Sequence, residues 1–349
     1  MYSFSKQKRK RGFFMASIRD VARRAKVSPA TVSRFLNQDP ALSITKETKQ
    51  RIEQAVSDLD YKKKSTVGQK KNSSVGILTI MSEEAEIDDP YFRSIRLGIV
   101  QEAKTQKIAA NRIYRVNDQL DFRVLKGLGA VIIVGHMGTE ILEEVKKQNE
   151  SIIIADDPFS PRETDAIFVD LEQAMTDHLE RLYRDGHREM VYIGGYRRTI
   201  DITGQYQEQD NDIRAFTYSA WMKAHNLTSR SYLGEWAALD GMRLTEKMLK
   251  EGKPTAIIAG SDPMAVGVYR AVQKAGLQIP EDISVVSFDN IEVASFLTPP
   301  LSTVDLEATE LGRIALRMAR DKIIGERTIP MQAKIPAKVI VRGSEQAIK

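Results

Sequence analysis

Cysteine is absent from this chain of 349 residues. Without thiols the protein has no disulfide, no cysteine nucleophile and no thiolate-bound metal. A chain of this kind is compatible with a reducing compartment, so we expect a cytoplasmic protein.

Long apolar runs are also missing. The longest, such as "AVIIVG" and "SIIIA", have the length of a buried strand, whereas a membrane helix needs roughly 18 apolar residues or more. The opening "MYSFSKQKRKRGFF" is basic, but no apolar segment of secretory length follows it. We therefore expect neither a membrane span nor a signal peptide. Met15 offers an alternative start, and residues 1–15 are interpreted as a basic extension outside the folded domains.

The sequence contains few signs of catalysis. It has no GxxxxGK-S/T phosphate loop, no GxSxG motif and no GxGxxG after a predicted strand. The histidines do not have metal-ligand spacing and are expected to be surface or hydrogen-bonded residues, namely His136, His178, His187 and His225. The sequence predicts no enzyme, no cofactor and no metal site.

Charge divides the chain in two. Residues 1–71 hold 18 Lys and Arg against 6 Asp and Glu, whereas the remainder holds 34 against 41. A small basic head on a mildly acidic body is typical of a nucleic-acid reader with a separate second domain. A solvated basic tail is the alternative, and it is the interpretation that we favour for residues 6–11.

The segment "ASIRDVARRAKVSPATVSRFLNQDP" predicts a helix-turn-helix. Ser17 and Asp20 have the spacing of a capping box, and Ser28 with Pro29 forms a typical start for a second helix. A third helix is expected from about Thr45. The apolar residues that recur with helical period are Ile18, Val21, Ala22 and Ala25 in the first helix, Val32, Phe35 and Leu36 in the second, and Ile52, Ala55, Val56 and Leu59 in the third.

Three helices of this kind form a DNA-binding unit whose second helix enters the major groove. Arg34 is the only residue there able to donate two hydrogen bonds to guanine, and hydroxyls at helix starts are expected to hold phosphates. A generic helical bundle is the alternative. The head residues predicted to contact DNA are Ser17, Ile18, Ser28, Pro29, Ala30, Thr31, Ser33, Arg34, Asn37, Thr45 and Thr48.

From residue 75 onward, short apolar runs alternate with amphipathic helices. The predicted strands are "VGILTI", "GAVIIVG", "SIIIAD", "AIFVD", "MVYIGG", "TAIIAGSD" and "SVVSFDN". Such alternation predicts parallel sheets covered on both faces, and some 270 residues suggest two doubly wound lobes. Ligands of these folds lie beyond the carboxyl ends of strands. Carboxylates recur at those ends and suit sugar hydroxyls, namely Asp156, Asp170, Asp262 and Asp289. Taken singly, each of them is more often a helix cap or a core residue.

The motifs together resemble the LacI/GalR family of bacterial repressors, closest to its evolved β-galactosidase and galactose-operon repressor branch. "SIRDVARRAKVSPATVSRFLN" is similar to the family's DNA-reading head. "DPYFRSIRLGI", "PTAIIAGSDPMAVGVYRAV", "GLQIPEDISVVSFDN" and "FLTPPLSTVDL" resemble its sensor signatures. The resemblance implies a two-lobed sensor of the periplasmic-binding-protein type and a homodimer or higher oligomer. It also implies a palindromic operator and a small effector, most simply a galactoside.

The resemblance also implies which residues contact the effector. Those that fall at the family's sugar-contacting or cleft positions are Tyr91, Asp156, Arg214, Trp236, Asp262 and Asp289. Ser261 and Leu306 differ from the polar residues found in relatives, so the contact set is not identical. Arg214 has an alternative role in a salt bridge on the lobe surface. Other sugars, purines or phosphorylated ligands remain open, and so does activation in place of repression.

The predicted domains are the head (16–61), a basic hinge linker (62–74) and the sensor (75–349). The family usually places a hinge helix at the linker and inserts a leucine into the minor groove. Here Gly68 disfavours a helix and no leucine is available. We expect a linker that is disordered without DNA and contacts phosphates through Lys62, Lys63, Lys64, Lys70 and Lys71, with Val67 as the only candidate wedge.

Two other protein classes fit parts of the sequence. A DNA binder without sequence preference would be basic at one end but would not need such a body. A periplasmic sugar carrier would share the body but would not carry the head. The presence of head and body in one chain disfavours both.

Overall fold

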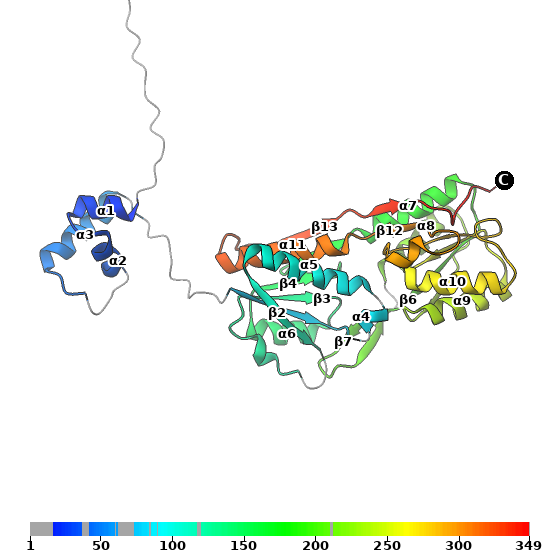
Figure 1. Ribbon diagram of the computed structural model, residues 1–349, viewed down its shortest axis with the longest axis horizontal. Helices are drawn as coiled ribbons and strands as arrows, with labels where there is room; N and C mark the ends of the chain where they lie inside the picture. Colours follow the sequence, from blue (N-terminus) through cyan, green and yellow to red (C-terminus); the bar gives the residue numbers. More distant parts are fainter. Residues whose placement is uncertain are drawn as a thin grey trace, which may run out of the picture. The chain divides into compact units, whose positions relative to one another are not determined.

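The computed structural model describes residues 17–36, 42–59, 61, 73–83, 85–88, 90–116, 120–209 and 212–348 (Figure 1). Contacts within the chain divide it into two compact units, Met1–Lys70 and Lys71–Lys349. The extension predicted for residues 1–15 lies outside the described residues, as does the predicted hinge linker apart from residues 73 and 74.

The first unit contains the three expected helices, α1 (Ile18–Ala25), α2 (Pro29–Leu36) and α3 (Lys46–Asp58). The predicted capping box at α1 is present, because Ser17 and Asp20 each bond the other's backbone N–H. Ser28 Oγ accepts the backbone N–H of Thr31 at 3.0 Å at the start of α2. These local bonds satisfy donors that a helix leaves unpaired at its first turn.

One apolar core joins the three helices of this unit. Its buried members are Val21, Ala22, Ala25, Val32, Ile52 and Ala55. Arg24 of α1 donates Nε to Asp58 of α3 at 2.9 Å and so ties these helices at the surface. The helical period read from the sequence therefore describes the packing correctly.

The second unit begins with a lobe built on a parallel sheet in the order β13-β5-β4-β3-β1-β2. Its strands are β1 (Ser74–Thr79), β2 (Ala109–Arg115), β3 (Ala130–Val134), β4 (Ile152–Ala155), β5 (Asp165–Val169) and β13 (Gln332–Ile335). Its helices are α4 (Ala85–Asp88), α5 (Pro90–Gln106), α6 (Thr139–Gln148) and α11 (Ala308–Ile324), with the 3₁₀ turn η1 (Phe122–Leu125). Helices α5 and α11 pack on one sheet face and α6 with η1 on the other.

The second lobe is smaller and repeats the plan with a parallel sheet in the order β11-β10-β6-β9. Its strands are β6 (Met190–Gly195), β9 (Ser231–Gly234), β10 (Ala256–Ala259) and β11 (Ser284–Val286). Its helices are α7 (Leu171–Arg184), α8 (Ile213–Ala224), α9 (Ala238–Glu251) and α10 (Asp262–Lys274), with the 3₁₀ turn η2 (Glu292–Ser295). Helices α7 and α8 pack on one face and α9 with α10 on the other.

Close helix packing in this lobe requires glycine. A Cβ on Gly267 of α10 would lie 1.9 Å from the Ala238 carbonyl oxygen and 2.5 Å from the Met242 nitrogen. Both atoms belong to the backbone of α9, so any side chain at Gly267 forces the two helices apart.

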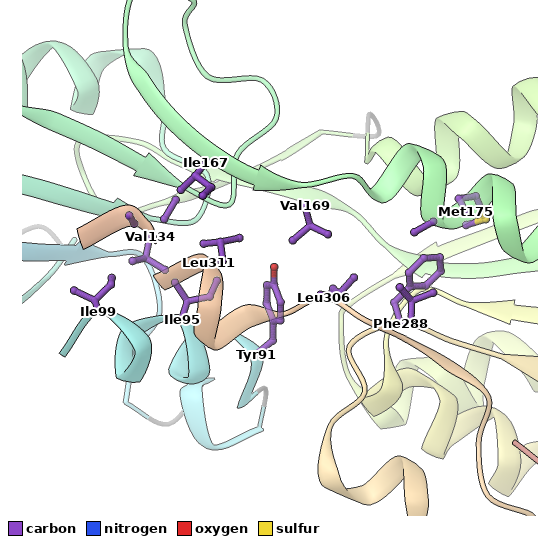
Figure 2. Close-up of a cluster of buried hydrophobic side chains, with 14 of the residues drawn as sticks. Tyr91, Ile95, Ile99, Val134, Ile167, Val169, Met175, Phe288, Leu306 and Leu311 are labelled. Carbon is purple, nitrogen blue, oxygen red and sulfur yellow. The ribbon is translucent and has the colours of Figure 1, made fainter. Parts of the chain in front are cut away.

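The lobes are linked where β5 leads to α7, where β12 (Thr303–Asp305) leads to α11, and where β13 leads to β14 (Lys338–Ile340). Strands β12 and β14 pair with each other in antiparallel fashion. Figure 2 shows Val169 and Leu306, on two of these links, between Tyr91 and Ile95 of the first lobe and Phe288 of the second. One buried cluster thus runs through the links into both lobes.

A hairpin also reaches from the second lobe to the first. It consists of β7 (Arg197–Ile200) and β8 (Tyr206–Gln209) and follows β6 directly. The backbone N–H of Gly138 donates to the Ile200 carbonyl at 3.0 Å, and Tyr206 Oη donates to the Ile80 carbonyl at 3.2 Å. Figure 1 shows β7 beside the first lobe. The hairpin was not predicted.

The expected α/β architecture is confirmed. All seven predicted strands form, and the amphipathic helices expected to alternate with them are present as α5 to α11. No helix among the described residues is long and apolar enough to span a membrane.

Candidate functional site

A cavity of about 400 Å³ lies where the carboxyl ends of the strands of both lobes meet. This is the position at which doubly wound folds hold their ligands. Its polar and aromatic lining includes Tyr91, Phe92, His136, Asp156, Phe159, Tyr196, Arg197, Arg198, Tyr206, Asp212, Arg214, Glu235, Trp236, Ser261 and Asp289. Five of the six residues predicted for the effector site are brought together here.

Tyr91 and Asp156 form a buried pair on the first lobe. Tyr91 stands at the start of α5, and Asp156 follows β4 with a positive φ of 72°. Tyr91 Oη donates to Asp156 Oδ1 at 2.7 Å. Burial raises the pKa of Asp156 to about 6, although nearby His136, Tyr91 and Arg214 lower it in part. Burial and the Asp156 charge raise the pKa of Tyr91 well above its ordinary value, so its hydroxyl remains a donor.

Arg214 is fixed at the opposite wall of the cavity by three contacts. Asp212 caps α8 and accepts Nε and Nη2 of Arg214, both at 3.0 Å. Arg214 Nη1 donates to the Gly260 carbonyl at 2.7 Å. Burial raises the pKa of Asp212, but the Arg214 charge and hydrogen bonds outweigh it and the pKa is lowered overall. The ion pair is therefore a buried one, unlike the surface salt bridge considered as an alternative.

Trp236 lies between β9 and α9 and is held firmly. Its Nε1 donates to the Tyr196 carbonyl at 2.9 Å, and the Arg214 guanidinium stands 4.3 Å from the ring centroid. A Cβ on Gly195 would lie 2.4 Å from the central indole atoms, so the backbone packs against the ring there. These contacts hold the indole rigidly at the cavity. The predicted contact of Trp236 with an effector stays a prediction.

Asp289, Ser261 and Leu306 complete this part of the lining. Asp289 Oδ2 accepts the backbone N–H of Asp262 at 3.3 Å, and Ser261 Oγ accepts that of Met264 at 3.4 Å as the N-cap of α10. Leu306 contributes an apolar side chain that is almost wholly buried.

Two carboxylates chosen from the sequence do not line the cavity. Asp262 is wholly buried, and its oxygens accept the Ile291 backbone N–H at 2.9 Å and the Thr303 hydroxyl at 2.7 Å. It therefore orders the loop after β11. Asp170 caps α7 and lies 3.1 Å from Lys334. The end of a strand was a correct guide to the region, but it did not separate ligand-facing residues from helix caps.

Several lining residues were missed. His136 follows β3 and its Nδ1 lies 3.1 Å from Asp157 Oδ1. Arg197 Nη2 lies 3.4 Å from the same oxygen, and Arg198 pairs with Glu235. A search for polar residues of every type after the predicted strands would have found both arginines after "MVYIGG" and His136 after "AVIIVG". His178 and His187 are buried and hydrogen-bonded, which agrees with the expectation of surface or hydrogen-bonded histidines. The position of His136 in the cavity lining was not predicted.

The cavity therefore holds three arginines, not the one expected. Each is matched by a carboxylate: Arg214 by Asp212, Arg198 by Glu235 and Arg197 by Asp157. Asp156 and Asp289 lie in the lining beyond these pairs. The site thus offers charge-neutralised donors and additional acceptors, which suits a neutral polyhydroxyl ligand. Among the described residues, no cluster of three or more histidines and carboxylates is arranged to hold a metal ion.

The head presents the predicted DNA-contacting residues at its surface. Pro29, Ala30 and Arg34 of α2 are exposed, and Thr31 and Ser33 are half-buried, while Val32 between them is in the core. Helix α2 therefore turns its apolar side inward and its predicted reading side outward.

The remaining head residues occupy helix starts. Ser17 and Thr45 are the N-caps of α1 and α3, and Thr48 donates its backbone N–H to Thr45. Ile18 packs partly against the head core. The predicted DNA contacts of Asn37, Lys62, Lys63, Lys64 and Val67 lie outside the described residues.

Each of the two units contains a segment that matches a known protein family. Residues 17–64 match the family "Bacterial regulatory proteins, lacI family", and residues 179–345 match the "Periplasmic binding protein-like domain". The chain is 34% identical to the HTH-type transcriptional repressor MelR of Bacillus subtilis over 341 residues, which cover 95% of this chain and 97% of MelR. It is 29% identical to the HTH-type transcriptional regulator GalR of Streptococcus thermophilus, covering 95% and 99% of the two chains.

A solved structure shares the fold. The Lac repressor dimer bound to operator and the anti-inducer ONPF is 22% identical with a TM-score of 0.67, covering 95% of this chain and 99% of that one. The matching relatives are transcriptional regulators and not enzymes. The chain therefore belongs to the lacI family of bacterial regulatory proteins and is a DNA-binding transcriptional regulator with a helix-turn-helix head and a two-lobed sensor.

Proposed function

We propose that this regulator is a cytoplasmic transcriptional repressor. In this proposal a homodimer binds a palindromic operator through two heads, and a small galactoside in the cavity between the lobes weakens that binding. Residues 16–61 read the DNA, residues 62–74 contact phosphates and residues 75–349 bind the effector and the second copy. The observation that carries the proposal is the cavity itself, in which Asp156, Asp289 and the braced Arg214 surround a single space.

The charge balance of the cavity favours a neutral sugar over a phosphorylated one. Every lining arginine is already paired with a carboxylate, so a phosphate would have to displace an existing partner. The carboxylates of Asp156 and Asp289 would also repel it. Sugar hydroxyls, by contrast, donate to such carboxylates and accept from Arg214 without any added charge.

A galactoside is proposed on the positions of these residues and on the relatives. Asp156, Arg214, Trp236 and Asp289 match the contact positions of galactoside-responsive family members. The regulators MelR and GalR, which cover nearly the whole chain, support a sugar-utilisation operon as the target. A different neutral sugar is the alternative for the same cavity.

The lobes offer a physical route for control of DNA binding. The three links between them are short, and one buried cluster runs through these links (Figure 2). A sugar that contacts Asp156 on one lobe and Arg214 on the other would favour one relative position of the lobes. A coupling of about 1–3 kcal/mol changes operator affinity roughly 5- to 150-fold.

Isothermal titration calorimetry on the full chain tests the effector assignment. Galactose and galactose-containing disaccharides should bind, whereas glucose 6-phosphate should not. Asp289→Asn should weaken galactoside binding about tenfold or more, because one charge-assisted hydrogen bond is lost. Tighter binding of the phosphorylated sugar than of any galactoside would refute a neutral effector.

A further inference from the structure

A second cavity, of about 670 Å³, adjoins the first and has no role in the function proposed above. Its walls are the β7–β8 hairpin of the second lobe and the start of α6 in the first. The polar residues in its lining are Thr139, Glu140, Asp157, Arg197, Thr199, Asp201, Thr203 and Gln207. We call it the hairpin cavity.

The two cavities share two lining residues, Phe159 and Arg197. The Arg197 guanidinium stands 4.6 Å from the centroid of the Phe159 ring, so the two side chains form one stacked partition. Phe159 is nevertheless 46% exposed. A chain-like ligand that fills the first cavity and passes this partition enters the hairpin cavity directly.

Charge in the hairpin cavity selects against anions. Arg197 is paired with Asp157 inside the protein, which leaves Glu140 and Asp201 as the remaining charged groups of the lining. Glu140 is exposed at the first turn of α6. An exposed aromatic ring beside carboxylate, hydroxyl and amide groups is suited to a sugar unit, which has an apolar ring face and many hydroxyls.

The hairpin is held in place before any ligand arrives. Ile200 is 2% exposed and packs in the core of the first lobe. A Cβ on Gly138 would lie 2.9 Å from the Ile200 carbonyl oxygen, so the two backbones are in close contact. Asp201 Oδ1 accepts the backbone N–H groups of Thr203 and Gln205 at 2.9 and 3.0 Å and orders the hairpin turn. The cavity wall is thus preformed, which lowers the entropic cost of binding.

We propose that the hairpin cavity is a second sugar subsite, which takes the next unit of a neutral oligosaccharide whose galactose end occupies the first cavity. Phe159 is the ring against which that unit packs, and Glu140 and Gln207 contact its hydroxyls. This inference rests on the galactoside proposed above and narrows it to galactose-ended oligosaccharides. It also gives the hairpin a function, because a ligand in both cavities contacts the first lobe and a segment of the second.

Calorimetry with galactose and with a galactose-ended disaccharide and trisaccharide tests the subsite on the full chain. The wild-type chain should bind the longer sugars at least about ten times more tightly than galactose. This is the gain in affinity expected from one additional stacking contact and one additional hydrogen bond. Glu140→Trp replaces a proposed hydroxyl-binding carboxylate with a bulky indole at the cavity wall and should remove this gain while leaving galactose affinity unchanged. Glu143→Trp is the matched control, because Glu143 is exposed on the same helix and does not line the cavity.

The outcomes separate the two proposals. If galactose binds but the longer sugars bind no more tightly, the subsite is refuted while the galactoside effector stands. If Glu140→Trp and Glu143→Trp reduce the gain equally, the subsite is also refuted. If no galactose-ended sugar binds to the wild-type chain, the effector assignment itself fails.

Discussion

We predict that Arg214 contributes both to the free energy of unfolding of the second lobe and to the binding affinity for the effector. Its side chain is 12% exposed and that of its partner Asp212 is 8% exposed. Arg214→Met leaves the Asp212 carboxylate buried without its cation. Breaking a buried pair in this way costs about 3–5 kcal/mol.

The loss should appear in thermal unfolding of the full chain, followed by circular dichroism. For a unit of this size, each kcal/mol shifts the melting temperature by about 2–4 °C, so Arg214→Met should lower it by about 6–20 °C. The double variant Arg214→Met, Asp212→Asn removes both charges and keeps a side-chain acceptor at the helix cap. It should recover at least half of the loss, because the uncompensated charge is gone.

A matched surface pair provides the control. Arg243 and Asp240 are also ion-paired near the start of a helix, but the Arg243 side chain is 63% exposed, so Arg243→Met should leave the melting temperature unchanged. Both Arg214 variants should lose galactoside binding in calorimetry, whatever their stability. A melting temperature for Arg214→Met within 2 °C of wild type, or no recovery in the double variant, would contradict this reasoning.

Four further changes have defined outcomes. Burial raises the pKa of Asp156 from 3.8 to about 6, so its protonated form stabilises the fold at acidic pH. This contribution to stability is complete below pH 3.8 and is lost as the pH rises through about 6. Because the accepting carboxylate forms above 6, calorimetric galactoside affinity should rise from pH 5 to pH 7, and Asp156→Asn should abolish the rise. Arg34→Ala should cost about 1–3 kcal/mol of operator affinity and relax specificity at one base pair in binding assays. Lys63→Ala should instead weaken binding to all sequences. The slope of the logarithm of affinity against the logarithm of salt concentration should fall by about 0.9, the value for one phosphate contact. Gly267→Ala places its Cβ 1.9 Å from the Ala238 carbonyl oxygen and should lower the stability of the second lobe by about 1–3 kcal/mol in urea unfolding.

Strongly patterned segments were predictable from the sequence. In the head, the capping box, the N-caps and the apolar period are local features, and the structure contains all of them. The central strands of both sheets were predictable because strands buried on both faces must be almost continuously apolar.

Edge strands and the hairpin were not predictable for the opposite reason. Strand β2, "AANRIYR", lies at the edge of its sheet and exposes much of its length, so it lacks an apolar run. The hairpin strand β8, "YQEQ", is polar, and its position is fixed by tertiary contacts such as the Tyr206 hydroxyl on the Ile80 carbonyl. Nothing local in the sequence signals those contacts.

The site was predicted in part because its residues follow strands. A search for carboxylates at strand ends found Asp156 and Asp289 but also selected Asp262, which follows β10 and bonds the loop after the neighbouring strand β11. The sequence did not show that Arg197 and Arg198 line the cavity in neutralised pairs, because their partners lie about 40 residues away along the chain.

Release of operator DNA by sugar is the most direct test of a sugar-controlled repressor. Fluorescence anisotropy of the full chain on its labelled operator, first located by footprinting upstream of its own gene, should be measured with and without galactosides at constant salt. A galactoside should weaken binding about 5- to 150-fold, and Asp289→Asn should require more of it for the same release. Unchanged operator affinity with every sugar at saturating concentration would contradict control by a sugar in the cavity between the lobes.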